Sequence, residues 1–292
     1  MVPSIIASLF FRPVMDCSST RWLRWALNCQ LWKPVATQWN HANKCIQEEE
    51  RQRIEQFVFQ APAISSLIGR LMLRKGIQEV IGSSNSNITF SRTAEGRPFL
   101  PGLDIIDINV SHHGDWVVLA LESGARVGVD VMSMDRPINK DLREYFRLMR
   151  KQFTDNEWRQ IDKSDNKLHA FYRFWCLKES YVKAIGVGLK YDLQTIDFNT
   201  SDELSRQRVI KSTKMKLKDQ SSDELLFEET LLDMNHCVAT CIAFSEQGLK
   251  EGVCDKPFTE VTIEHLLNLE TITDEVDEGL WTRFNSKQYS AR

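Results

Sequence analysis

The order of predicted strands and helices occurs twice along this chain, and this repetition constrains the fold more than any other feature of the sequence. Apolar residues that recur every three or four positions predict helices, and short apolar runs between turn residues predict strands. The first half contains one strand, then two helices, then two strands, at residues 21–32, 46–57, 61–81, 105–111 and 116–121. The second half contains a strand at 125–134, helices at 139–149, from 154 and at 168–185, and strands at 213–218, 225–232 and 237–244.

We therefore expect an α+β fold of two similar lobes, each a β-meander packed with helices and each of about 120 residues. The predicted N-terminal lobe is 1–123, of which residues 1–20 are expected to be peripheral, and the C-terminal lobe is 124–250. Residues 251–292 hold one short helix candidate and a run of acidic residues, and we interpret them as a peripheral acidic tail. The cleft between two lobes is the usual place for a ligand, so we expect the active site there.

The charge balance excludes a protein dedicated to nucleic acid binding. Lysine and arginine number 37 and aspartate and glutamate number 40, which gives a net charge of -3, whereas nucleic-acid binders are usually basic. The chain is 42% hydrophobic and 26% charged, which excludes a wholly disordered protein. Any site for an anion must therefore be local.

The sequence predicts a cytosolic protein. Seven cysteines without a C-x-x-C pair do not form the pattern of a disulfide framework, so we expect a reducing compartment. The apolar run from Ile5 to Phe11 is far shorter than the roughly 20 residues of a membrane helix, and we expect no membrane association. Serines and arginines near the start resemble a transit peptide, so the mitochondrion is the alternative location.

Two distant segments carry acidic residues that can meet at one divalent cation. Asp130 lies among β-branched residues of a predicted strand, and Glu179 and Lys183 lie four residues apart on a predicted helix, hence on one face. Mg²⁺ in proteins usually binds one or two carboxylates together with substrate phosphates, and a neighbouring lysine suits a further phosphate oxygen. Alternatively, Asp130 caps a turn after the strand and the other two residues form an exposed ion pair. The residues alone leave both interpretations open.

Two predicted turns carry groups suited to phosphate. Arg92 and Arg97 flank Gly96 in the first turn, and guanidinium groups bind phosphate bidentately. The second, Asn109–Gly114, follows a strand and presents an amide, a hydroxyl and two imidazoles, and ligand contacts concentrate in such loops. The alternatives are a solvated hairpin tip and structural histidines.

Together these motifs resemble the 4′-phosphopantetheinyl transferases of the surfactin-synthetase-activating type. The family pattern is a G-V/I-D strand followed by W/F-x-x-K-E-S-x-x-K-A, present here as Gly128-Val129-Asp130 and as the segment from Trp175 to Ala184. The turn RTAEGRP, the loop NVSH and the segment KAIGVGL are similar to animal members of the family. The resemblance extends over about residues 21–244.

The resemblance implies two lobes related by a pseudo-twofold axis, with coenzyme A bound between them. It implies metal ligation by Asp130 and Glu179 and catalytic roles for Glu179 and Lys183. The implied contacts with coenzyme A are Arg53, Arg92, Thr93, Ala94, Glu95, Gly96, Arg97, Asn109, Val110, Ser111, His112, Glu179, Ser180 and Lys183.

The implied reaction is a Mg²⁺-dependent transfer of 4′-phosphopantetheine from coenzyme A to a serine of an apo acyl or peptidyl carrier protein, with release of 3′,5′-ADP. A noncatalytic coenzyme A or carrier-binding protein on the same fold is one alternative, because Met132 stands where bacterial members commonly have a second acid and a thioether is a poor Mg²⁺ ligand. A Mg²⁺-dependent phosphohydrolase is another.

The implied partners are carrier domains of fatty acid synthases and of aminoadipate reductase-like enzymes. Carriers of this kind tend to be acidic, so one predicted basic helix is a candidate docking surface, and an ordinary solvated helix face is the alternative. Its basic residues are Lys140, Arg143, Arg147, Arg150 and Lys151. We expect a monomer, since two lobes in one chain need no partner subunit.

Overall fold

The computed structural model describes residues 22–136, 141–188, 191–217, 220–221, 224–244 and 257–290. The first half contains β1 (Trp22–Asn28), α1 (Ala36–Lys44), α2 (Glu48–Glu55), α3 (Gln60–Ile81), the short strands β2 (Ser91–Arg92) and β3 (Pro98–Phe99), β4 (Ile106–His113) and β5 (Trp116–Ser123). The second half contains β6 (Ala125–Ser133), α4 (Leu142–Met149), α5 (Asp155–Lys163), α6 (Lys167–Ile185), β7 (Ile196–Asn199), β8 (Lys214–Leu217), β9 (Gln220–Ser221), β10 (Leu225–Leu231) and β11 (His236–Phe244). The final segment contains β12 (Thr259–Glu260), α7 (Ile263–Leu267) and α8 (Leu280–Asn285). The predicted peripheral residues 1–20 lie outside the described residues, as does Lys140.

The two halves share one connectivity. In the first half, β1 pairs with β5 and β5 pairs with β4; in the second, β6 pairs with β11 and β11 pairs with β10. Each half thus runs from a strand through helices to a hairpin, and the last hairpin strand pairs with the first strand of the half. The predicted α+β class and the repeated order of elements are confirmed. Sequence analysis missed α1, whose few apolar positions, chiefly Trp39 and Ala42, give only a weak helical pattern.

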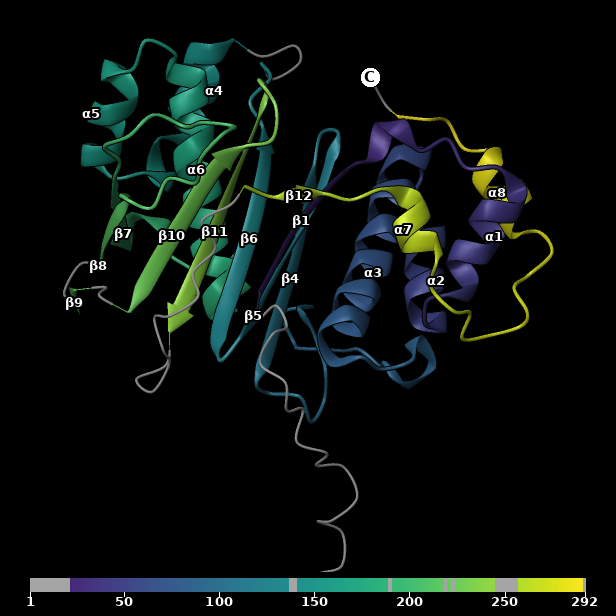
Figure 1. The fold of residues 1–292 in the computed structure, drawn as a ribbon. Helices are drawn as coiled ribbons and strands as arrows, with labels where there is room; N and C mark the ends of the chain where they lie inside the picture. The colour runs from purple at the N-terminus through teal and green to yellow at the C-terminus, as the bar shows by residue number, and fades with distance from the viewer. Residues whose placement is uncertain are drawn as a thin grey trace, which may run out of the picture.

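The two sheets face each other in the middle of the molecule, and the helices cover their outer faces (Figure 1). Valines 127, 129 and 131 of β6 meet Val118 and other apolar side chains between the sheets. A second core lies between the first sheet and α3, and a third lies between the second sheet and α6. Strands such as β5 are therefore buried on both faces, which explains why their sequences are apolar runs. Among the described residues, no helix combines the length and apolar character needed to cross a membrane.

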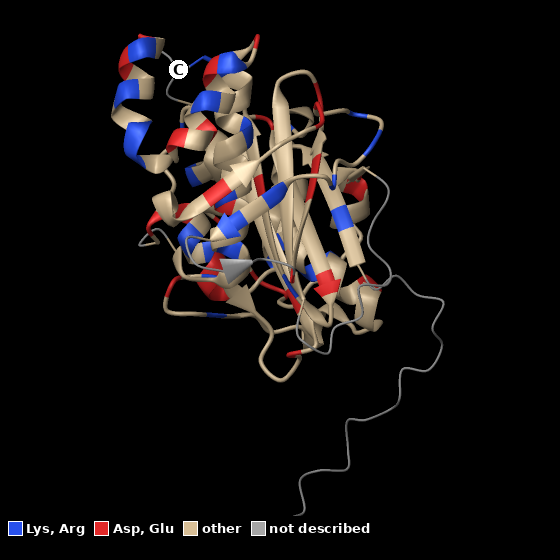
Figure 2. Ribbon diagram, turned by 90° about the vertical axis from the view of Figure 1, so that its left-hand side faces the viewer, with Lys and Arg blue, Asp and Glu red and all other residues tan. Residues whose placement is uncertain are grey.

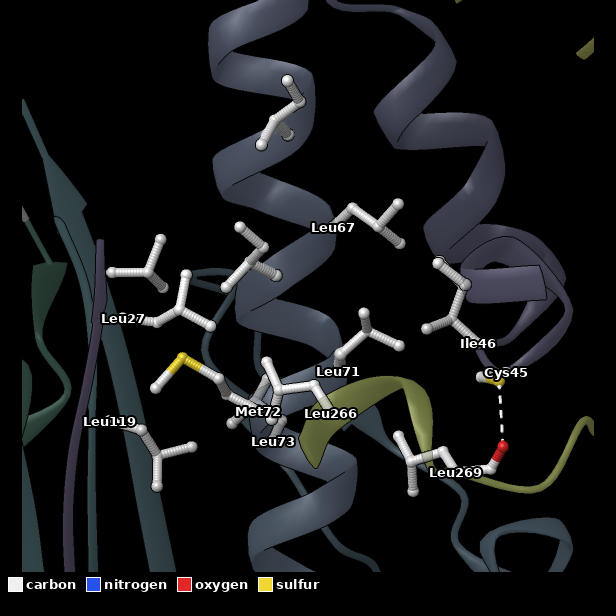
Figure 3. Close-up of a cluster of buried hydrophobic side chains, with 14 of the residues drawn as sticks. Leu27, Cys45, Ile46, Leu67, Leu71, Met72, Leu73, Leu119, Leu266 and Leu269 are labelled. Atoms are coloured by element: carbon white, nitrogen blue, oxygen red, sulfur yellow. Dashed lines mark hydrogen bonds between the residues drawn. The ribbon is translucent and has the colours of Figure 1, made fainter. Parts of the chain in front are cut away.

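The C-terminal segment belongs to the N-terminal core. The sequence analysis interpreted residues 251–292 as peripheral, but β12 pairs with β1, and Leu266, Leu280 and Phe284 are buried. Figure 3 shows Leu266 and Leu269 packed beside Leu71 and Leu73 of α3. The Phe284 ring stacks on Trp39, with their centroids 3.7 Å apart. The prediction was wrong for 257–290 because the acidic residues between these apolar positions hide the pattern.

A buried ion cluster joins the two sheets at one side. Arg24 of β1 pairs with Glu122 of β5 and, at 2.9 Å, with Glu228 of β10. Burial, together with the charge of Glu228, raises the pKa of Glu122, while Arg24 opposes the rise. The cluster therefore links the first strand of one half to the first hairpin strand of the other.

Gly128 allows α6 to lie directly against β6. A Cβ atom at this position would lie 2.1 Å from the carbonyl oxygen of Ser180 and 2.3 Å from the backbone nitrogen of Ala184. Both are backbone atoms of α6, so neither can move aside as a flexible side chain would. This close contact fixes the position of α6 along β6, and hence which residues of the helix lie opposite which residues of the strand.

We predict that Gly128→Ala lowers the free energy of unfolding by about 3 kcal/mol or more, because the strand and helix must separate. Urea denaturation measures the change. Gly69→Ala on α3 is the matched control: its Cβ would meet Val110 at an ordinary 3.4 Å, and alanine favours a helix over glycine by about 1 kcal/mol, so stability should not fall. A Gly128→Ala variant that unfolds at the wild-type urea concentration would show that the contact is dispensable.

Candidate active site

Side chains of β4 hold the edge of β6. Asp107 and Asn109 accept hydrogen bonds from the backbone N–H groups of Val127 at 2.8 Å and Val129 at 2.9 Å. Nδ1 of His113 accepts from the N–H of Ser133 at 2.8 Å. Every second residue of a strand points to the same side, so this row faces β6 and satisfies backbone donors that lack a neighbouring strand on this side. We call this contact between β4 and β6 the active seam.

Ser111 of the same row connects β4, β6 and α6. Its hydroxyl donates to Oδ1 of Asp130 at 2.9 Å and accepts from Nζ of Lys183 at 2.8 Å. Nζ of Lys183 also donates to Oδ1 of Asp130 at 2.6 Å and to the carbonyl oxygen of Val129 at 3.1 Å. Three acceptors therefore orient this ammonium group. The structure brings together four of the residues that the sequence singled out, namely Asn109, Ser111, Asp130 and Lys183.

The positive groups of the protein do not fully balance the acidic side chains of the seam. Oδ2 of Asp130 is buried and has no hydrogen-bond partner. Burial and the charge of Asp130 raise the pKa of Glu179, while Lys183 opposes the rise. An unpartnered carboxylate oxygen beside a second carboxyl group is costly unless a cation binds both. The two acids thus fit a divalent cation.

The side chain of Met132 is partly buried and packs against the core between the second sheet and α6, and a thioether is a poor Mg²⁺ ligand. Within the described residues, no cluster of three or more His, Cys, Asp or Glu side chains is arranged for a metal ion. Substrate and water oxygens would complete the shell, which is the usual arrangement for Mg²⁺.

Arg97 fastens its turn to both halves. Its guanidinium group donates to Asp107 and to the carbonyl oxygen of Val127, each at 2.7 Å, and to the carbonyl oxygen of Lys183. These contacts hold the C-terminal end of α6 against β4 and β6. Arg97 was predicted to bind phosphate, but in the structure its guanidinium group donates hydrogen bonds to protein oxygen atoms.

The other end of the turn is held by α2. Arg92 donates three hydrogen bonds to Glu50, at 2.7, 2.8 and 3.1 Å, and one to the carbonyl oxygen of Gly96 at 2.6 Å. Gly96 has a φ of +86°, which favours glycine, and its N–H donates to the carbonyl oxygen of Thr93. Ala94 and Glu95 form the exposed tip. An open pocket of about 670 Å³ adjoins this turn, with Thr93, Arg97 and Asp107 in its lining.

His112 is an exposed residue of β4 next to Ser111 of the seam. Desolvation of the ring and the positive charges of Lys183, Arg70 and His113 lower the pKa of His112 to about 4, so the ring is neutral at physiological pH. A neutral imidazole still offers one N–H donor to an anion. Arg53 is exposed in the last turn of α2.

Two predicted contact residues point elsewhere. Val110 packs in the N-terminal core, and the hydroxyl of Ser180 is buried and donates to the carbonyl oxygen of Leu177 at 2.8 Å. Their contacts with coenzyme A stay predictions and would need backbone atoms. Lys178 of the W-x-x-K-E-S motif is also structural, since it is fully buried and pairs with Glu157 at 2.9 Å.

The structure adds residues that sequence reasoning missed. Asp107 lies two residues before Asn109 and four before Ser111, so all three point to the same side of the strand. This spacing of two residues could have identified Asp107 from the sequence. Arg70 lies on α3 beside Ile68 and Leu71, and an arginine within such a buried helix was the signal there.

Comparisons with known proteins agree with this geometry. Residues 30–124 match the family described as 4′-phosphopantetheinyl transferase, N-terminal, and residues 126–241 match the 4′-phosphopantetheinyl transferase superfamily. The L-aminoadipate-semialdehyde dehydrogenase-phosphopantetheinyl transferase of Xenopus laevis is 39% identical over 280 residues, which cover 91% of this chain and 92% of that protein. The Homo sapiens protein of the same name is 38% identical over 279 residues, or 90% of each chain. A 4′-phosphopantetheinyl transferase of Aneurinibacillus migulanus is 29% identical over 232 residues, or 79% of this chain and 87% of that protein. The chain therefore belongs to the 4′-phosphopantetheinyl transferase superfamily.

Proposed function

We propose that the phosphopantetheine that this transferase delivers to carrier proteins comes from coenzyme A, that the acceptor is a carrier serine, and that 3′,5′-ADP is released. The observation that supports this most directly is the network of Ser111, Asp130 and Lys183 beside Glu179. This network holds the ammonium group of Lys183 in place, beside the incompletely paired carboxylate of Asp130, where the two halves meet.

The proposed reaction is a displacement at phosphorus. The serine oxygen forms a bond to the phosphorus that bears pantetheine, and the bond from that phosphorus to the oxygen of 3′,5′-ADP breaks. The serine hydroxyl releases its proton to solvent water, and the departing 3′,5′-ADP takes up negative charge. Such a reaction depends on positioning and charge stabilisation more than on covalent help from the protein.

The residues of the seam divide this work. Lys183 is oriented before substrate arrives, so its positive charge can stabilise the negative charge that develops on the leaving group without reorganisation. Asp130 and Glu179 would hold Mg²⁺, and a bound Mg²⁺ would neutralise part of the pyrophosphate charge. Arg97 positions Lys183 by binding its carbonyl oxygen. We propose cation binding as the main role of Glu179, because a bound cation favours the ionised carboxylate and weakens it as a base.

We further propose that the enzyme acts as a cytosolic monomer on carriers that include those of fatty acid synthase and aminoadipate reductase-like enzymes. Both halves of the seam come from one chain, which supports a monomer. Within the described residues, Cys29, Cys45, Cys176, Cys237 and Cys241 are free thiols, as a reducing compartment would keep them.

We propose that the exposed side of α4 and the turn after it receives the acidic carrier. Arg143, Arg147, Arg150 and Lys151 are exposed there, around Leu148, whose surface is 60% exposed. Figure 2 is viewed from the side of the molecule on which α4, α5 and α6 lie and shows lysine and arginine positions in blue on helices there. An apolar centre with a basic rim suits an acidic partner that buries a small apolar contact.

The proposed transfer predicts a gain in the mass of the carrier. Incubation with apo carrier, coenzyme A and Mg²⁺ should raise the mass of the carrier by one phosphopantetheine group, and a chelator should stop the gain until Mg²⁺ is restored. Mass spectrometry of the carrier measures this. An unchanged carrier mass with coenzyme A bound would indicate a noncatalytic binding protein, and phosphate release without carrier would indicate a phosphohydrolase.

Glu179→Gln should increase stability and reduce transfer. In the metal-free protein, the raised pKa of Glu179 makes its ionisation unfavourable to folding, so stability falls as the pH rises from the ordinary value of 4.5 through the raised value. The variant should therefore have a higher Tm than wild type at neutral pH, and the difference should vanish below pH 4.5. Transfer should fall about 100-fold or more, because a charged group is lost from the transition state.

Exposed Glu203 provides the control, since Glu203→Gln should change neither Tm nor turnover. Near-normal transfer by Glu179→Gln would overturn the role assigned to Glu179.

The docking proposal predicts a salt-dependent effect. Replacing Arg143, Arg147 and Lys151 together with alanine should raise the KM for an acidic carrier about tenfold at low ionic strength and much less at high salt, because salt screens exposed charges. The matched control replaces Lys163, Lys214 and Lys216, three exposed lysines of the same half. Equal KM values for both triple variants at low salt would place docking elsewhere.

A further inference from the structure

The C-terminal end of α6 presents backbone carbonyl groups that no amide of the helix can reach. The last carbonyl oxygens of a helix lack partners within it and carry its negative partial charge. Gly186 ends α6 with a φ of +75°, and its N–H donates to the carbonyl oxygen of Val182 at 2.9 Å. The next carbonyl group, that of Lys183, therefore needs a donor from outside the helix.

Arg97 supplies this donor from the first half of the chain. Its guanidinium group donates through Nη1 to the carbonyl oxygen of Lys183 and through Nη2 to that of Val127 at 2.7 Å. The Arg97 side chain is only 9% exposed, so water competes little for these contacts. Its positive charge lies at the negative end of the helix, where a cation is favourable. Arg97 thus caps the end of α6.

Asp107 fixes the orientation of this cap. Its Oδ2 atom accepts hydrogen bonds from Nη2 of Arg97 at 2.7 Å and from the N–H of Val127 at 2.8 Å. Asp107 lies on β4, where its backbone is paired with that of Glu122 on β5. The donors of a guanidinium group form a planar fork, so a carboxylate held on one of them restricts the direction of the others. The Nη1 atom of Arg97 is thereby directed at α6.

The cap is important because Lys183 lies in the last turn of α6. Helix ends fray, and the ammonium group of Lys183 keeps its contacts with Ser111 and Asp130 only while this turn stays helical. A displacement of about 1 Å near the reacting groups can cost about 100-fold in rate. Asp107 contacts Arg97 rather than Lys183, so its effect on the lysine passes through the arginine.

Building on the proposed function, we propose that Asp107 is a positioning residue for the transfer. It holds Arg97 as a cap on the C-terminal end of α6, and the capped turn holds Lys183 at the active seam before substrate binds. Asp107 touches neither the phosphates nor the cation in this role. The coupling joins the turn at residues 92–97 to the group that stabilises the leaving group.

Asp107→Asn tests the cap directly, because asparagine keeps the size of the side chain and removes its charge. Backbone amides in the last turn of α6 should exchange with deuterium about tenfold faster in the full-length variant, since a weaker cap lets the turn open more often. Mass spectrometry of peptides covering residues 180–188 measures this exchange without any substrate. Exchange at the wild-type rate would overturn the proposal.

Carrier transfer measures the consequence for catalysis. The kcat of Asp107→Asn should fall about tenfold, with the KM for the carrier unchanged because the docking surface on α4 is intact. Arg97→Gln should lower kcat at least as much, and the double variant should be no slower than Arg97→Gln alone, since residues that act as a unit are not additive. Additive losses would show that Asp107 acts through the edge of β6 and not through Arg97.

Asp104→Asn is the matched control. Asp104 is exposed and lines the same open pocket as Asp107, and its replacement should change neither the exchange of α6 nor kcat. If Asp107→Asn lowered Tm but left kcat unchanged well below the Tm, its role would be purely structural and the proposal wrong. Absence of transfer by wild type would instead refute the proposed function, whereas the exchange measurement would still decide whether the cap exists.

Discussion

The active seam is the contact on which the site depends. An edge strand exposes backbone N–H groups that must find acceptors, and β6 finds them in the side chains of Asp107, Asn109 and His113. Because side chains bridge the two strands, the fourth member of the row, Ser111, is available to bind Asp130 and Lys183. One structural device therefore joins the halves and orients the reactive groups.

The repeated connectivity creates two such contacts, and the exposure of their basic side chains distinguishes them. In the connectivity, β1 corresponds to β6 and β10 corresponds to β4. On the β1 and β10 side, Arg24 pairs with Glu122 and Glu228, and its guanidinium group also donates to two backbone carbonyl oxygens. Each contact has one buried carboxylate oxygen without a hydrogen-bond partner, Oε1 of Glu228 at the first and Oδ2 of Asp130 at the active seam. The Arg24 side chain is only 2% exposed, whereas the Lys183 side chain at the active seam is 27% exposed. An incompletely satisfied buried charge is unfavourable for folding alone, and it provides the means to bind a cation and an anionic substrate.

Several residues singled out in the sequence lie together in the structure, but the sequence did not predict the contacts of each side chain. The G-V-D strand and the helix from Lys167 to Ile185 formed as expected, and the repeated order of elements was correct. Arg97 and Ser180 fell within matched motifs, yet their side chains bind protein atoms, because a motif gives position along the chain and not the direction of a side chain. Arg70 was missed because its environment comes from α2, β2 and β4, which are distant in sequence. The C-terminal segment was misjudged because its few apolar residues acquire a partner only on the folded surface of α3 and α1.

By itself, the sequence determined the class of fold, the repeat and the identity of the acidic and basic residues that can handle phosphate, because periodicity and residue chemistry are local properties. The tertiary structure alone decided which charges are paired and which are left over. It paired Lys183 with Asp130 and gave Arg97 and Arg92 protein acceptors. It left Nε and Nη1 of Arg70 and one oxygen of Asp130 without hydrogen-bond partners. Pairing depends on distance and burial between segments far apart in the chain, and the strength of a charge interaction is set by that burial.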